Sequence, residues 1–124
     1  MEQEIDKILE KARRDKVVLA VALFGSSLKG KGRDVDICIF LNEKKSDLEM
    51  SKKRLDFLKE LSNKFDVNIF QQLPVYIRIR ILKESKVLFV RDENVLYEIA
   101  FSTIKEFEFF KKVYRMCLDK VKYG

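Results

Sequence analysis

Two aspartates, Asp34 and Asp36, are the residues whose type and spacing most clearly permit chemistry. They stand two positions apart in DVDICIFL, an apolar stretch with the length of a β-strand. Because successive side chains of a strand point to opposite faces, both carboxylates share one face with Cys38 and Phe40. Carboxylate oxygens suit a hard cation such as Mg²⁺, and unpaired charge is costly to bury. The pattern therefore predicts a magnesium site, or a mouth open to solvent, at the start of this strand.

A glycine-rich segment precedes the aspartates. The apolar run VVLAVALF has the length of a strand covered on both faces, and it ends at Gly25 and Ser26. Residues 25–31 also match most of the Walker A pattern G-x-x-x-x-G-K. Gly32 stands where that loop needs a hydroxyl, and a strand follows where it needs a helix. Both differences argue against a P-loop.

A third carboxylate, Asp66, lies in FDVNIF, which also alternates like a strand. If this strand lies beside the one that carries Asp34 and Asp36, three carboxylates could gather in one site. Such a set fits phosphoryl or nucleotidyl transfer, in which cations neutralise a triphosphate and an acid takes a proton from the attacking hydroxyl. A plain strand-end aspartate is the alternative for Asp66.

The remaining pattern predicts an α+β fold, a mixed sheet of about four strands flanked by helices, in one domain spanning residues 1–124. An amphipathic helix is expected over residues 3–14, and residues 86–90 fit a short edge strand. Residues 74–83 are ambiguous, because IRIRIL alternates like a strand whereas Pro74 suits a helix start. Asp92 would cap a long final helix that runs to about Lys120.

A further helix is predicted to begin with a capping box and to run to about Asn63. The capping pair is Ser46 with Glu49. The expected apolar face consists of Leu48, Leu55, Leu58, Leu61 and Phe65.

Composition narrows the class of protein. The chain has no histidine, which excludes mechanisms that need an imidazole base. Cys38 and Cys117 form no CxxC pair and are expected to be buried free thiols. The net charge of +6 favours anionic partners, although a generally charged surface explains it equally well. No apolar run reaches the roughly 18 residues of a membrane span, and the acidic opening lacks the features of a signal peptide, so a cytoplasmic protein is expected.

Residues 23–40, LFGSSLKGKGRDVDICIF, resemble the signature of the DNA-polymerase-β-like nucleotidyltransferase superfamily. That signature places an apolar-Gly-Ser segment and a variable loop before Asp-x-Asp in a strand. The length and the later FDVNIFQQLP resemble the minimal nucleotidyltransferases, which are often encoded beside HEPN-domain proteins in toxin–antitoxin pairs. The resemblance implies the polymerase-β-like fold and a helix over residues 74–83.

The resemblance also implies a role for each matching residue. Gly25 and Ser26 would hold the triphosphate, Asp34 and Asp36 would bind one or two Mg²⁺ ions, and Asp66 would be the third metal-binding acid, which activates the acceptor. The implied activity is transfer of AMP from ATP to a tyrosine of a HEPN-domain partner, which silences that toxin.

Two departures from the family pattern bear on this activity. The loop between Ser26 and Asp34 is shorter than in many relatives, and Arg33 stands where a small residue is usual. Lys29 and Arg33, with Lys31, either face the phosphates or form a solvated basic loop. A catalytically weak antitoxin that acts by contact alone is therefore the alternative function, and RNA binding, which rests on charge alone, is a more distant one.

The chain is too short to carry a second domain for the acceptor, so a partner chain, a dimer or a macromolecule must bring the accepting hydroxyl. Apolar residues on the final helix spread beyond one narrow stripe, which suits a partner interface. The alternative is that all of them pack on the sheet. These residues are Phe101, Phe107, Phe109, Phe110, Tyr114 and Met116.

Overall fold

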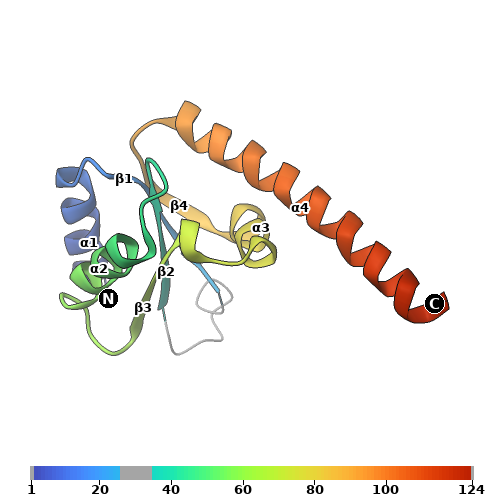
Figure 1. Cartoon of the computed structure of the whole chain (residues 1–124). Helices are drawn as coiled ribbons and strands as arrows, with labels where there is room; N and C mark the ends of the chain where they lie inside the picture. The colour runs from blue at the N-terminus through green and yellow to red at the C-terminus, as the bar shows by residue number, and fades with distance from the viewer. Residues whose placement is uncertain (1, 26–34, 124) are drawn as a thin grey trace.

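The computed structural model describes residues 2–25 and 35–123. Four strands form one sheet, helices pack against it, and the last helix extends away from it (Figure 1). In chain order the elements are α1 Glu2–Arg14, β1 Val18–Phe24, β2 Val35–Leu41, α2 Asp47–Leu58, β3 Phe65–Ile69, the 3-10 helix η2 Phe70–Gln72, α3 Val75–Glu84, β4 Lys86–Val90 and α4 Glu93–Tyr123.

The sheet has the strand order β3-β2-β1-β4. β1 runs antiparallel to both β2 and β4, whereas β2 and β3 are parallel. The expected mixed sheet of four strands is thereby confirmed, with β4 at one edge. The two most apolar strands, β1 and β2, occupy the middle, where both faces of a strand are covered.

Each face of the sheet has its own apolar core. On one face Ile37 and Ile39 pack with residues of α1 and α2, including Phe57. On the other face Cys38 and Phe40 pack with residues of η2, α3 and α4. Phe40 stacks on Phe70 with ring centroids 4.2 Å apart. The alternation of side chains along β2 therefore sorts its residues as the sequence predicts.

The prediction for α2 was correct at its start, wrong at its end, and correct for part of the apolar face, because Leu58, Leu61 and Phe65 pack in the core. The Ser46 hydroxyl accepts a hydrogen bond from the Glu49 amide, as in the predicted cap, but the helix ends at Leu58. Two tighter turns follow, in which the Leu61 amide donates to the Leu58 carbonyl. Leu48 and Leu55 are exposed, whereas Met50 and Phe57 are buried. The members of each pair are seven residues apart, so spacing alone could not show which pair is buried. Burial of Phe57 is favoured over burial of Leu55 because the aromatic side chain has the larger apolar surface.

The ambiguous segment is helical. The Pro74 carbonyl accepts from the amides of Ile77 and Arg78, which starts α3, and Ile81 enters the core. This confirms the helix that the family resemblance implies, and not the strand that the IRIRIL alternation would suggest. The physical reason is that a helix covers the face of the sheet that carries Cys38 and Phe40.

The two cysteines have different environments. Cys38 is buried, as predicted, and burial raises the pKa of its thiol, so it stays protonated and unreactive. Cys117 is exposed, so the expectation that it is buried was wrong. The reason is that the described side chains of residues 112–121 on α4 are all exposed, where this helix extends past the sheet (Figure 1).

The first half of α4 is attached to the body. The Asp92 carboxylate accepts from the amide of Asn94, which caps the helix as predicted. Further along, the Arg78 guanidinium of α3 donates two hydrogen bonds to the Glu106 carboxylate, at 2.9 and 2.8 Å. Among the residues that the structure describes, no helix, α4 included, has the length and apolarity to span a membrane.

The Arg78–Glu106 pair predicts a pH-dependent contribution to stability. Hydrogen bonds from Arg78 hold the pKa of Glu106 below its ordinary value of 4.5. A carboxylate with a lowered folded pKa stabilises the fold fully above its unfolded pKa, and the gain is lost as the pH falls through the folded pKa. Glu106→Gln should therefore lower the free energy of unfolding by about 0.5–1 kcal/mol near neutral pH and by almost nothing in acid. Thermal unfolding of both proteins across this range measures it, and a deficit that stays constant with pH would contradict it.

Candidate active site

Three of the predicted site residues come together at one end of the sheet. Asp36 on β2 pairs with Phe24, the last residue of β1, so Gly25 follows directly beside it. In the parallel ladder between β2 and β3, Asp36 is the register partner of Asp66. Neighbouring strands lie about 4.8 Å apart, so the two carboxylates are adjacent on one face. The strand that carries Asp66 therefore lies beside the strand that carries Asp36, as a shared site requires.

Two features require glycine at position 25: its backbone conformation and the closeness of Asp36. Its φ of +89° lies in the left-handed region that residues with a Cβ rarely adopt. A methyl group built on it would meet the Asp36 side chain, with Cγ at 3.2 Å and Oδ2 closer still. The glycine therefore brings bare backbone against the Asp36 carboxylate.

Asp66 is held by side chains that the sequence reasoning missed. Arg54 Nη2 donates to Asp66 Oδ1 at 3.2 Å, and Asn68 Nδ2 lies 3.4 Å from Oδ2. Arg54 Nε also donates to the Val67 carbonyl at 2.6 Å, on the edge strand. Strand alternation could have found Asn68, which shares a face with Asp66. Arg54 reaches the site from α2, and no spacing in the sequence indicates that contact.

Arg54 should act as a positioning residue. Arg54→Ala removes both its bond to Asp66 and its bond to the edge of β3, so we expect a loss of about 1–2 kcal/mol in the free energy of unfolding. In the nucleotidyl transfer that the family resemblance implies, we expect a loss of about tenfold in kcat. The KM for the nucleotide should change little, and Arg54→Lys should recover only part of kcat because it lacks the fork of donors. Lys52→Ala, on the exposed side of α2, is the control. An unchanged kcat in Arg54→Ala would show that the pair is only structural.

The other predicted site residues, Ser26, Lys29, Arg33 and Asp34, lie outside the described residues. Within residues 2–25 and 35–123, no three side chains of the metal-ligating types gather. The fit of a divalent cation is therefore judged on Asp36 and Asp66. Two adjacent carboxylates on one face are the donors that Mg²⁺ accepts, and Mg²⁺ commonly binds one or two carboxylates together with substrate phosphates.

A cavity of about 180 Å³ adjoins Gly25. Its walls are mainly apolar, from the end of β1 and from α3, and Arg80 adds a positive charge. Arg80 lies 3.8 Å from Glu84 in a mostly exposed pair, which leaves its guanidinium accessible from solvent. The sequence offered no signal for Arg80 beyond the ambiguous IRIRIL segment. The lining residues are Phe24, Gly25, Ile77, Arg80, Ile81 and Glu84.

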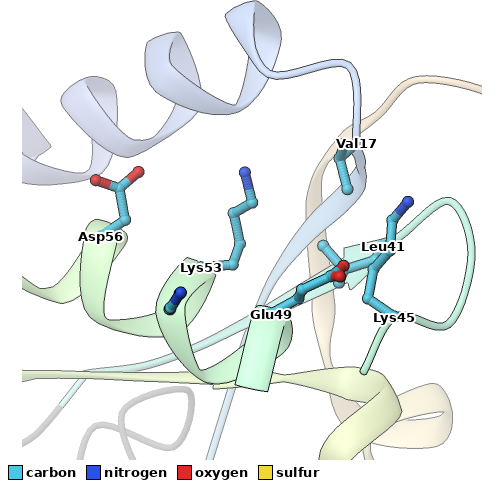
Figure 2. A pocket seen from close by; sticks show the side chains of 7 residues that line it. Val17, Leu41, Lys45, Glu49, Lys53 and Asp56 are labelled. Atoms are coloured by element: carbon cyan, nitrogen blue, oxygen red, sulfur yellow. The ribbon is translucent and has the colours of Figure 1, made fainter. Parts of the chain in front are cut away.

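A larger hollow of about 560 Å³ lies at the opposite end of the sheet (Figure 2). It is bordered by Val17, just before β1, and by Leu41, which ends β2. Its lysines have acidic neighbours: Lys53 pairs with Asp15 at 2.5 Å. Because its lining mixes lysines with Glu49 and Asp56, this hollow lacks the concentrated positive charge of an anion site.

Comparison with known sequences agrees with this geometry. The family model described as "Polymerase beta, Nucleotidyltransferase" matches residues 3–94. A protein of Methanocaldococcus jannaschii named "Putative protein adenylyltransferase" is 36% identical over 101 residues, which cover 79% of this chain and 70% of that protein.

Solved structures share the fold. A toxin–antitoxin structure with AMP-PNP has a TM-score of 0.71 at 17% identity, over 98% of both chains. The complex of the tri-AMPylated HEPN toxin with its MNT antitoxin, from Shewanella oneidensis, gives 0.68 at 16% identity, over 98% of this chain and 95% of that one. A "putative nucleotidyltransferase" of Sulfolobus solfataricus gives 0.50 at 17% identity, over 72% of this chain and 79% of that one. With the Gly25–Asp36–Asp66 arrangement and the match over residues 3–94, the chain belongs to the polymerase-β nucleotidyltransferase family and is a nucleotidyltransferase.

Proposed function

We propose that the protein transfers AMP from ATP, with Mg²⁺, to a hydroxyl of a partner protein. The observation that carries the proposal is the contact of Gly25 with Asp36, directly beside Asp66. Bare backbone next to two carboxylates suits a polyphosphate that approaches closely and is neutralised by cations. The similarity to a protein named as an adenylyltransferase supports AMP as the transferred group.

In this proposal Gly25 and Ser26 hold the triphosphate, and Lys29 and Arg33 add positive charge beside it. Asp34, Asp36 and Asp66 would hold one or two divalent cations. When bound, Mg²⁺ supplies charge neutralisation of the phosphates and orientation of the α-phosphate.

The chain's own residues would then serve the transfer itself. The acceptor hydroxyl forms a bond to the α-phosphorus, the bond to the β-phosphate breaks, and pyrophosphate leaves. Asp66 takes the hydroxyl proton, which requires that Asn68 or Arg54 release one of its oxygens. Arg80, at the cavity beside Gly25, would meet the nucleotide from the α3 side.

The partner we propose is a HEPN-domain protein, with this chain as the antitoxin of the pair. Structures that share the fold over 98% of this chain include a complex of a HEPN toxin with an MNT antitoxin, in which the toxin is AMPylated. Residues 1–124 would act as one domain in the cytoplasm, which stays a prediction.

A contact-only antitoxin has one observation in its favour, because both oxygens of Asp66 already have protein donors. One assay separates the two functions. The protein is incubated with labelled ATP, Mg²⁺ and the HEPN-domain protein encoded beside it, and transfer of label and toxin activity are both measured. Transfer of label to the partner supports the enzyme, whereas silencing of the partner without label would replace it with the contact module.

A further inference from the structure

Among residues 2–25 and 35–123, nothing covers the far half of α4. The helix has 31 residues and is therefore about 46 Å long. The Arg78–Glu106 pair attaches the middle of the helix to α3, whereas every described side chain from residue 112 to 121 is exposed. Figure 1 shows this half, drawn in red, extending past the sheet and α3.

The exposed half carries the same apolar stripe that attaches the first half to the body. Leu96, Ala100, Thr103 and Phe107 are partly or fully buried at steps of four and three residues. The stripe continues with the same steps through Phe110, Tyr114, Cys117 and Val121. Alternating steps of three and four place these residues along one line of a helix, the pattern by which two helices pack together.

The stripe is ordered and wide. The rings of Phe107 and Phe110 are 6.4 Å apart and nearly parallel, and those of Phe110 and Tyr114 are 6.1 Å apart. Val113 and Leu118 lie on either side of it, 41% and 48% exposed. An apolar ridge of this size on one exposed helix marks an interaction site.

α4 is also an addition to the catalytic module. The family match ends at residue 94, one residue after α4 begins. The two toxin–antitoxin structures align over 98% of this chain, so their alignment includes α4. Almost all of α4 therefore lies outside the matched domain, although its first half packs against the core.

We propose that the stripe on α4 from Phe107 to Val121 docks the acceptor protein, through a helix of that protein whose apolar face is flanked by acidic side chains. This rests on the proposed function. Between residues 105 and 121 there are five basic and three acidic residues, and Glu106 is already paired with Arg78. The chain as a whole has a net charge of +6, so a second copy would bring like charges together, whereas an acidic partner is complementary.

Native Cys117 tests the proposal without any mutation. It lies on the stripe and is exposed, whereas Cys38 is buried, so iodoacetamide should modify Cys117 alone in the free protein. Addition of the HEPN-domain protein encoded beside the chain should slow this modification at least about tenfold. A stoichiometric complex in which Cys117 reacts as fast as in the free protein would overturn the docking proposal.

A matched pair of variants then locates the surface. Tyr114→Glu places one negative charge on the stripe, and Ser102→Glu places the same charge on an exposed position of α4 away from it. Tyr114→Glu should weaken partner binding about 10- to 100-fold and reduce transfer of label at limiting partner, with ATP binding and Tm unchanged, while Ser102→Glu should bind normally. Equal affinity in both variants would overturn the proposal.

Other occupants and a failure of the proposed function give different results. If the protein self-associates in sedimentation and Tyr114→Glu abolishes this, the stripe binds a second copy. If anionic phosphatidylglycerol vesicles alone protect Cys117, the stripe binds a membrane. Either result overturns the proposal. A complex that protects Cys117 but receives no label supports the docking surface while rejecting transfer. Absence of any complex overturns both.

Discussion

Asp36→Asn should lower the rate of nucleotidyl transfer by about 10³-fold while leaving the fold intact. Asn keeps the shape of the side chain but removes the negative charge that a divalent cation needs. No other residue of β2 or β3 can replace it, because Asp36 alone lies both against Gly25 and in register with Asp66. The measurement is single-turnover transfer of label from ATP, together with Tm and the affinity for the nucleotide.

Asp6→Asn is the control for this prediction. It removes the same charge from an exposed position on α1, which packs on the opposite face of the sheet from Asp36, and should leave the rate of transfer unchanged. A rate within about twofold of the wild type in Asp36→Asn would remove Asp36 from the catalytic machinery and leave the metal site without support.

Gly25→Ala should have the second-largest effect, on both activity and stability. A residue with a Cβ at φ +89° is strained, and its methyl group would displace the Asp36 carboxylate. We expect a loss of about 1–3 kcal/mol in the free energy of unfolding and of about 100-fold in kcat. Chemical denaturation and the transfer assay measure the two effects separately.

The double variant Gly25→Ala/Asp36→Ala separates the two causes of this effect. Removal of the Asp36 carboxylate relieves the overlap but leaves the backbone strain, so the double variant should be more stable than the sum of the single changes predicts. Additive free energies would mean that the methyl group never meets Asp36, and the close approach of Gly25 would then have no role in placing that carboxylate.

The sequence by itself determined the strands and the face on which each carboxylate lies. Alternation along DVDICIFL and FDVNIF placed Asp36 and Asp66 on the face opposite the neighbouring apolar residues, and the strand after the glycine loop excluded a P-loop. These features follow from a period of two residues, which local sequence contains in full. The roles of Ser26, Lys29, Arg33 and Asp34 stay predictions, because they lie outside the described residues.

Only the tertiary structure decided which surfaces meet. It buried Phe57 instead of Leu55 on α2 and brought Arg54 around the edge of β3 to Asp66. Among the described residues, it left Cys117 and the far half of α4 without cover. A repeating pattern shows that a helix has an apolar face. It does not show which of two similar faces will be buried, nor how far along the helix the neighbouring elements extend. For this protein the local pattern therefore located the two carboxylates, and the packing of layers determined what holds Asp66 and what remains open for a partner.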